Sequence, residues 1–196
     1  MVIPTHGGRF LPEAVRSVQA QAFADWELVI VDDGSTDGTA EVAHTLASKD
    51  ARIRVATNPR NLGIAAARNR GLASISPDSR FVAFLDHDDL WMPGALETLR
   101  GALLANPQAS AAHGTATGID QLGATAPYPR ERTRRMGIVN GRLVEWPRER
   151  ATEFANLAYE NCIVSTGSAL IQRKDLDALG GFDLRAAPAD DHDLWI

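Results

Sequence analysis

The sequence predicts an α/β fold, with a mostly parallel central sheet covered by helices on both faces. Three features of the first 105 residues favour this fold. Short apolar runs alternate with stretches of helical period. Residues 28–31 are apolar throughout, as in a strand that is buried on both faces. Turns rich in glycine, aspartate and asparagine separate these segments, so we expect strands and helices to alternate.

Four strands are expected in this half, each a short apolar run bounded by a turn. The first lies at the start of the chain, and the second is the run at 28–31. The third ends at the turn Asn58-Pro59-Arg60-Asn61, and the fourth ends at a cluster of aspartates. The expected strands are residues 2–4, 28–31, 53–56 and 81–85.

Four helices are expected between and after these strands. In the first, Leu11, Ala14, Val15 and Val18 recur at helical spacing. The second follows a Gly-Ser-Thr-Asp-Gly turn that supplies capping residues, and the third is rich in alanine. The fourth has Pro93 in its first turn, where a proline is tolerated. The expected helices are residues 10–22, 39–47, 64–73 and 93–104.

Beyond residue 105 the pattern weakens, because glycine, proline and threonine become more frequent and the periodicity fades. A helical segment is expected at 151–159, a strand at 168–171 and a short helix at 174–179. Between residues 128 and 150, seven arginines stand against three glutamates, a local charge of +4. This stretch is either a solvated loop or a flap that meets an anionic ligand.

The charge and the cysteine content exclude several classes of protein. With 25 acidic and 20 basic residues the chain carries −5, whereas a general nucleic-acid binder usually shows a basic excess. The single cysteine, Cys162, excludes an internal disulfide framework and a thiolate zinc cluster, and it fits a reducing compartment.

No apolar run reaches the roughly 20 residues of a membrane span, and no secretory signal pattern opens the chain. We expect a cytoplasmic protein, with peripheral association at the inner face of a membrane left open.

Acidic residues gather where two of the expected strands end. Asp32 and Asp33 close the second strand, and Asp86, Asp88 and Asp89 close the fourth. In a parallel sheet, ligands bind outside the carboxyl ends of the strands, so the two clusters are expected to share one crevice. Carboxylates that lie together there repel one another unless a cation sits between them.

The Asp86-His87-Asp88 triplet is compatible with a metal site. In an extended segment the side chains of Asp86 and Asp88 point the same way, and both could face one hard cation. Oxygen ligands favour Mg²⁺ or Mn²⁺ over zinc. The alternative is a simple turn, in which Asp89 caps the segment that leads into Leu90 and Trp91.

Two further segments have a structural and a functional interpretation each. Asp33 either belongs to an ordinary turn or accepts a hydrogen bond from a base or a ribose, and only one of Asp32 and Asp33 can easily point into the crevice. Arg68, one to two turns inside a helix, is either a surface residue or reaches back to hold an acidic group or a phosphate.

The last acidic cluster contains Asp183, Asp190, Asp191 and Asp193, and its middle pair lies where a helix begins. The structural interpretation is a helix cap whose charge complements the helix dipole. The functional interpretation is a general base that a loop delivers to the crevice. Motifs of P-loop NTPases, dinucleotide dehydrogenases and α/β-hydrolases are absent from the sequence.

Five segments, taken in order, resemble family 2 glycosyltransferases of GT-A fold. They are VIPTHGG, QAFADWELVIVDDGSTDGT, NLGIAAARNRGL, FLDHDDLWMPGAL and GGFDLRAAPADDHDLW. Each is weak alone, but five in the family's order and spacing are specific. The resemblance implies a Rossmann-like three-layer α/β/α sandwich in one domain, with 1–105 as the nucleotide-binding half and 106–196 as the acceptor-binding half. By the same likeness, we expect the acceptor-binding half to continue past Ile196.

The resemblance also implies a reaction and its participants. The family transfers a sugar from a nucleotide diphosphate, often a UDP-sugar, to an acceptor hydroxyl, usually with inversion at the anomeric carbon. By this likeness the cofactor is Mn²⁺ or Mg²⁺, and the donor is a nucleotide-sugar. The acceptor would be a glycan or a lipid-linked sugar in polysaccharide, glycolipid or cell-envelope synthesis.

The family's motifs give roles to residues in the first half of the chain. Pro4, Thr5 and His6 match the loop that lines the nucleoside, although the family usually has Thr-Tyr-Asn there. Asp33, with Asp32 beside it, matches the acid that contacts the base.

The family's motifs also suggest an arginine near the nucleotide, the metal ligands and the catalytic base. Arg68 matches an arginine that lies near the nucleotide. In the Asp-x-Asp motif, Asp88 would ligate the metal on the diphosphate, and Asp86 would touch the ribose or the same ion. Asp191 matches the catalytic base, with Asp190 beside it.

Two other functions remain as alternatives at this point. One is a nucleotidyltransferase on a related fold, whose glycine-rich and basic first loop is matched only in part by Thr5-His6-Gly7-Gly8-Arg9. The other is a non-catalytic module that binds a nucleotide-sugar or a glycan, against which the intact Asp88 and Asp191 argue.

Overall fold

The computed structural model describes residues 1–126, 136–139, 142–145, 151–153, 163, 165–186 and 190–195. At 126, 136–139, 142–145 and 190–192 it describes the secondary structure alone.

The sheet begins with three parallel strands in the order β3-β2-β1. These are β1 (Val2–Thr5), β2 (Leu28–Asp32) and β3 (Ile53–Thr57). On the free side of β1, a parallel bridge joins Val2 to Phe84. This bridge brings the segment that begins with β4 (Phe81–Val82) alongside β1, so the expected parallel arrangement holds for all four strands of the first half.

The sheet then continues with antiparallel strands from later in the chain. β10 (Ala169–Gln172) pairs antiparallel with β4 on one side and with β5 (Ala111–His113) on the other. The sequence predicted β10 within one residue, but it gave no sign of the direction in which β10 runs. Pairing depends on contacts between strands about 60 to 90 residues apart, which no local pattern encodes.

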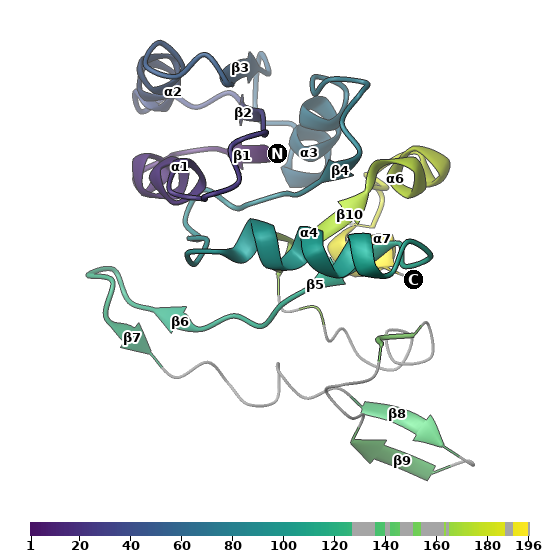
Figure 1. Cartoon of the computed structure of the whole chain (residues 1–196). Coiled ribbons are helices and arrows are strands. Elements are labelled where there is room, and N and C mark those ends of the chain that lie inside the picture. Colours follow the sequence, from purple (N-terminus) through teal and green to yellow (C-terminus); the bar gives the residue numbers. More distant parts are fainter. Residues whose placement is uncertain are drawn as a thin grey trace.

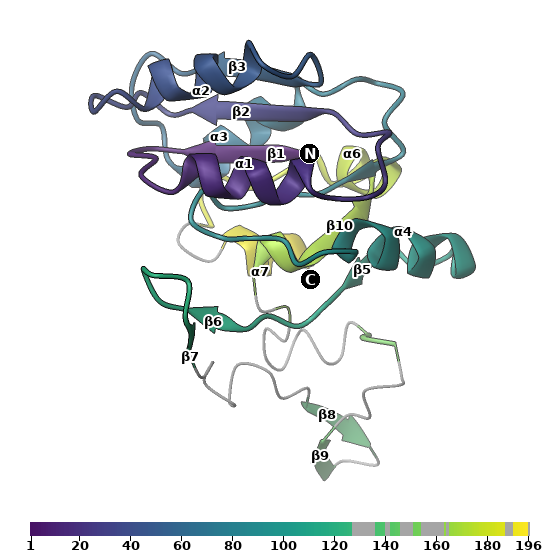
Figure 2. The same ribbon diagram turned by 60° about the vertical axis from the view of Figure 1, so that its left-hand side comes forward.

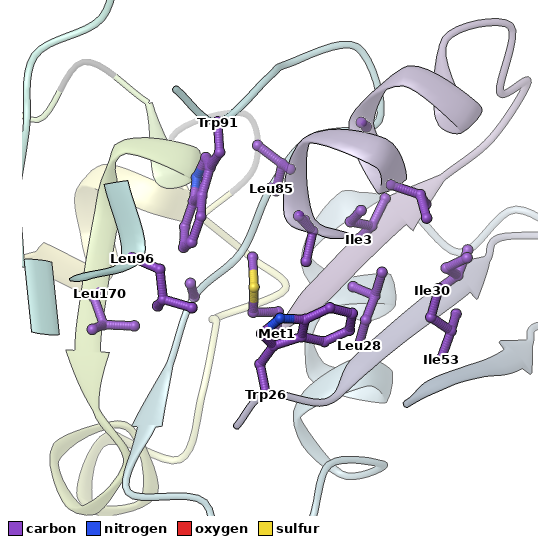
Figure 3. Close-up of a cluster of buried hydrophobic side chains, with 14 of the residues drawn as sticks. Met1, Ile3, Trp26, Leu28, Ile30, Ile53, Leu85, Trp91, Leu96 and Leu170 are labelled. Carbon is purple, nitrogen blue, oxygen red and sulfur yellow. The ribbon is translucent and has the colours of Figure 1, made fainter. Parts of the chain in front are cut away.

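Helices cover the two faces of the sheet and complete three layers (Figure 1). In β2, Leu28 and Ile30 belong to the core on one face, and Val29 and Val31 to the core on the other, because successive strand side chains alternate. α1, α2 and α4 contribute to the first core, part of which Figure 3 shows, and α3, α6 and α7 contribute to the second. The helices are α1 (Leu11–Gln19), α2 (Thr39–Ala47), α3 (Ile64–Leu72), α4 (Ala95–Ala105), α6 (Arg173–Leu179) and α7 (Asp190–Trp195).

Several element ends differ from the sequence predictions. The first helix ends at Gln19 and not at residue 22, and α4 begins only after Gly94, whose φ of 78° is left-handed. The expected fourth strand is regular only at 81–82, with an isolated bridge beyond it. Of the helix expected at 151–159, residues 151–153 are not helical and the rest lies outside the described residues.

Short antiparallel strands occupy part of the segment where periodicity fades. β6 (Gly118–Ile119) pairs with β7 (Thr125–Ala126), and β8 (Met136–Val139) pairs with β9 (Arg142–Glu145). Strands of two to four residues are too short to give a recognisable alternation in the sequence. The arginine-rich stretch lies mostly outside the described residues, so its interpretation as a flap stays a hypothesis. Across the described ranges, no helix is long and apolar enough to cross a bilayer.

Candidate active site

Three strands that run in the same direction end at one edge of the sheet. In the registered pairs at this edge, Thr5 lies opposite Asp32, and Asp32 lies opposite Thr57. The segment of β4 runs parallel to β1, so Asp86 follows its end at the same edge. Figure 2 shows β1 and β2 side by side with their arrowheads pointing the same way. The fold therefore brings the two acidic clusters to one edge, where α/β proteins bind ligands.

The loop after β1 is tied to the loop after β2. Asp33 N–H donates to Thr5 O at 2.8 Å, and His6 Nδ1 lies 3.0 Å from Asp33 O. Gly8 N–H donates to Thr39 Oγ1 at 2.7 Å. Pro4 and Thr5 are buried, whereas His6 is exposed at the rim. Of the three residues assigned to the nucleoside loop, His6 is thus the one whose side chain is open to a ligand.

Asp33 holds the loop that follows β3. Its carboxylate is 3% exposed and accepts hydrogen bonds from Asn58 Nδ2 at 2.7 Å, Leu62 N–H at 3.1 Å and Gly63 N–H at 2.9 Å. Asp32 is equally buried and accepts from Ser35 N–H at 3.2 Å. Both carboxylates are therefore engaged by the protein, and a contact from Asp33 to a base stays a proposal.

Gly34 allows this loop to approach closely. Its φ is 71°, and a Cβ built on it would lie 2.4 Å from the carbonyl carbon of Arg60. Only glycine fits such a contact in the left-handed region. The turn after β2 and the turn after β3 are thus packed backbone against backbone.

Arg68 reaches the acidic edge from inside α3. Gly63, with a φ of 90°, precedes α3, and Arg68 lies in its second turn with 5% of its surface exposed. Its Nη2 donates to Asp86 Oδ1 at 3.0 Å, and its guanidinium lies over the ring of Phe182 at 5.3 Å. The structure therefore agrees with the interpretation in which Arg68 holds an acidic group. A charge-assisted hydrogen bond of this kind fixes Asp86 in place.

The segment from Asp86 to Asp89 is a turn and not an extended strand. Asp89 N–H donates to Asp86 O at 3.0 Å, which closes the turn over His87 and Asp88. The expectation that Asp86 and Asp88 share a direction by strand alternation is therefore wrong in its premise. Asp88 is exposed at the tip of this turn.

Asp89 completes a crowded group of carboxylates. Its side chain accepts a hydrogen bond from Ser165 Oγ at 3.3 Å. It does not cap the segment that leads into Leu90 and Trp91, as the alternative interpretation expected. Burial raises the pKa of Asp89, and the neighbouring carboxylates of Asp86 and Asp88 raise it further. The repulsion among these three groups is what a bound cation would relieve.

The donor set at this turn fits a divalent metal ion that also takes ligands from its substrate. In the part of the chain that is described, no three His, Cys, Asp or Glu residues are arranged to enclose a metal. Mg²⁺ and related hard cations usually take only one or two protein carboxylates and fill the remaining positions with water and phosphate oxygens. Asp88, exposed at the tip, and Asp86 behind it could provide these.

The expected base lies in α7, which follows β10 and α6 in the chain. Asp190 and Asp191 form the first turn of α7, and their side chains lie outside the described residues. Asp193 is exposed. Asp183 pairs with Arg185 at 2.6 Å, and this ion pair lowers the pKa of Asp183 to about 2.

Sequence reasoning missed two residues that organise this site. Asn69 makes two hydrogen bonds to the backbone of Phe182, and Ser165 donates to Asp89. Asn69 stands beside Arg68 in the segment NLGIAAARNRGL, and this neighbourhood was the available signal. Ser165 lies in a segment without periodicity, so no sequence signal indicated its role.

The fold is an α/β sheet whose parallel strands end in acidic residues at the edge where such sheets bind ligands, and comparison with known proteins names the family. The model of glycosyl transferase family 2 matches residues 1–180. The chain therefore belongs to this family of glycosyltransferases, which are transferase enzymes. This assignment gives no support to the nucleotidyltransferase alternative.

A curated relative and two solved structures agree with the family. The chain is 36% identical over 107 residues to the Escherichia coli UDP-Glc:alpha-D-GlcNAc-diphosphoundecaprenol beta-1,3-glucosyltransferase WfgD, covering 54% of this chain and 41% of WfgD. S. aureus TarS 1-349 in complex with UDP has a TM-score of 0.71 at 20% identity, over 98% of this chain and 52% of TarS. The mannosyltransferase PcManGT from Pyrobaculum calidifontis, in complex with GDP-Man and Mn2+, has a TM-score of 0.65 at 22% identity, over 98% and 49%.

These structures establish the GT-A fold of the chain. The first curated relatives are longer proteins, and the chain covers 38%, 10% and 41% of their lengths.

Proposed function

We propose that this chain transfers a sugar from a nucleotide-diphosphate sugar, with UDP-sugars as the expected donors, to an acceptor hydroxyl with inversion. The observation that carries the proposal is the Arg68–Asp86 pair at the carboxyl edge of the sheet, with Asp88 exposed at the tip of the same turn. A cation-binding carboxylate beside a fixed carboxylate and a buried arginine is suited to the diphosphate and ribose of such a donor.

A divalent cation, Mn²⁺ or Mg²⁺, would supply Lewis-acid stabilisation of the charge that develops on the leaving diphosphate. Asp88 is the residue that we expect to hold it, because its side chain is exposed. Asp86, fixed by Arg68, would touch the ribose or the same ion. The PcManGT complex with GDP-Man and Mn2+ supports this choice of cofactor by analogy of fold.

The nucleoside would lie over the tied loops at the ends of β1 and β2. His6 presents an exposed ring there, held by the carbonyl of Asp33, and could stack on a base. Pro4 and Thr5 would shape the wall beneath it. Asp33 would act on the base either directly or by holding loop 58–63 in place. TarS in complex with UDP supports uridine as the nucleoside.

Asp191, with Asp190 beside it, would serve as the general base. It would take the proton of the acceptor hydroxyl as that oxygen attacks the anomeric carbon and the bond to the diphosphate breaks. Attack from the face opposite the leaving group inverts the anomeric centre. Both aspartates lie in the first turn of α7.

The acceptor, location and domain division are also part of the proposal. WfgD is named for a diphosphoundecaprenol-linked acceptor, which supports a lipid-linked or glycan acceptor in cell-envelope synthesis. With such an acceptor, we expect the reaction to take place in the cytoplasm, at the inner face of the membrane. Residues 1–105 would bind the nucleotide and 106–196 the acceptor, with the arginine-rich stretch 128–150 as an additional contact for the diphosphate.

The test is transfer to acceptor or water over a panel of nucleotide-sugars with Mn²⁺. We expect Asp88→Ala to lower kcat/KM by about 100-fold or more, because the metal-held charge stabilisation is lost. Asp191→Asn is expected to lower kcat with little change in the KM for the donor. Asp78→Asn, an exposed carboxylate at the opposite edge of the sheet, is the control and should leave both constants unchanged.

Two results would contradict the proposal. Unchanged activity in both Asp88→Ala and Asp191→Asn would show that the site is elsewhere. Metal-dependent UDP binding with no turnover of any donor would instead favour the non-catalytic binding module.

A further inference from the structure

Asn69 connects α3 to a loop more than 100 residues further along the chain. Its Nδ2 donates to Phe182 O at 2.8 Å, and Phe182 N–H donates to its Oδ1 at 2.8 Å. One side chain thus satisfies both backbone polar groups of a single residue. Asparagine is suited to this because its short amide carries a donor and an acceptor side by side.

The loop is built to receive this side chain. Gly181 has a φ of 88°, and a Cβ built on it would lie 2.5 Å from Asn69 Oδ1. Phe182 is buried and packs edge-on against Phe84, with ring centres 4.9 Å apart. Since Phe84 lies in the segment bonded to β1, the loop is fixed to the sheet and to α3 at the same point.

Two neighbouring residues of α3 therefore hold two different parts of the site. Arg68 holds Asp86, on the side that we assign to the donor. Asn69 holds Phe182, in the loop that precedes α7. Leu194 of α7 belongs to the same buried cluster as Phe182, so the position of this loop and the position of α7 are linked by packing.

We infer that Asn69 is a positioning residue, which sets the position of α7, the helix that carries Asp190 and Asp191. The inference rests on the proposed function, since it takes this pair as the source of the base. Among the described residues, the side-chain hydrogen bonds of Asn69 go to Phe182 and not to Asp86 or Asp88, so its loss should disturb α7 more than donor binding.

The experiment compares Asn69→Ala and Asn69→Asp with Ser74→Ala as a control. Ser74 donates to Arg70 O at the end of the same helix and contacts no part of the site. We expect Asn69→Ala to lower kcat by about 10- to 100-fold, as misplacement of a catalytic group by about 1 Å can do, with the donor KM within about threefold. Asn69→Asp keeps the acceptor for Phe182 N–H but sets a carboxylate oxygen against Phe182 O, so its kcat should be no higher than that of Asn69→Ala. Ser74→Ala should match the wild-type protein.

Hydrogen exchange in the same variants provides a readout that needs no activity. Asn69→Ala should increase exchange at amides 180–195 and leave the amides of α2, residues 39–47, as protected as in the wild type. A rise in donor KM with kcat unchanged, or exchange at 180–195 equal to that of wild type, would overturn the inference. If the wild-type protein transfers no sugar, the proposed function fails, and the exchange result still decides whether Asn69 holds the loop.

Discussion

The guanidinium of Arg68 lies 3.0 Å from the carboxylate of Asp86 and is almost completely buried, whereas the Asp86 side chain is 32% exposed. The pair therefore has one end in the core and the other at the surface of the site. This geometry fixes the orientation of Asp86 without removing it from solvent. A carboxylate held in this way is preorganised for a ligand.

Replacement of Arg68 by lysine tests this preorganisation. Lysine keeps the charge but loses the planar fork and the stacking on Phe182, so Arg68→Lys is expected to weaken UDP binding by about 10-fold. Calorimetric titration of UDP in the presence of Mn²⁺ measures this effect. Arg185→Lys changes an exposed arginine paired with Asp183 and should leave the affinity unchanged. Equal affinity in all three proteins would show that Arg68 has no part in donor binding.

Asp33 is expected to stabilise the fold through the loop that it holds. Asp33→Ala removes the acceptor of the buried Asn58 amide and of the Leu62 and Gly63 N–H groups. It should lower the free energy of unfolding by about 3 kcal/mol, since an unpaired buried donor is costly. Urea denaturation provides the measurement. Asp120→Ala removes a similar acceptor of backbone N–H groups at an exposed turn and should cost less than about 1 kcal/mol. Equal losses would contradict the role given to Asp33.

Alanine substitutions at Gly34 and Gly94, when compared, separate the effect of close packing from that of backbone conformation. Both have left-handed φ values, 71° and 78°, but a Cβ at Gly94 meets nothing within 4 Å, whereas one at Gly34 meets Arg60. Gly94→Ala should therefore lower the free energy of unfolding by about 1 to 2 kcal/mol, from conformation alone. Gly34→Ala should cost clearly more, and thermal or urea unfolding of both variants compares them. A smaller loss in Gly34→Ala would mean that the contact with the 58–61 turn is not tight.

Glu27, at the opposite edge of the sheet, should make stability depend on pH. Burial alone would raise the pKa of Glu27, but hydrogen bonds from Ser76 N–H and Ser79 Oγ, and the ion pair with Arg54, outweigh it and lower that pKa. Because the folded pKa lies below the unfolded one, the stabilisation is complete above the unfolded pKa, about 4.3, and is lost as the pH falls through the folded pKa.

The variant Glu27→Gln gives the measurement. Its free energy of unfolding should fall short of the wild-type value at pH 7, and the two should converge as the pH is lowered below about 4. Parallel urea titrations at pH 7, 5 and 3.5 follow the difference. A difference that stays constant across this range would contradict the pKa assignment.

Local patterns in the sequence were sufficient for the first half of the fold. The all-apolar run at 28–31 became the buried strand β2, and the helix expected at 39–47 is α2 with the same ends. Alternation of strand and helix implied the parallel order, because a crossover through a helix returns the chain in the same direction. The antiparallel β10 could not be predicted, since its place between β4 and β5 depends on distant contacts.

In the site, too, one part could be predicted from local sequence patterns and another part could not. Parallel strands that end at one edge were enough to expect Asp32 and Asp86 together, and the structure has them there. The turn at Asp86–Asp89 could not be distinguished from an extended segment, because aspartates occur in both and the deciding hydrogen bond is to a backbone carbonyl. Asn69 and Ser165 act through partners 113 and 76 residues away, and no sequence spacing indicates such contacts.

Calorimetric titration of UDP into the purified protein, with and without Mn²⁺, tests the cation site at Asp88 when the wild type is compared with Asp88→Ala and Asp78→Asn. If the turn after β4 holds a cation for the diphosphate, UDP binds the wild type and Asp78→Asn only with Mn²⁺, and Asp88→Ala loses this binding. Equal binding of UDP by wild type and Asp88→Ala, independent of Mn²⁺, would contradict a cation site at Asp88.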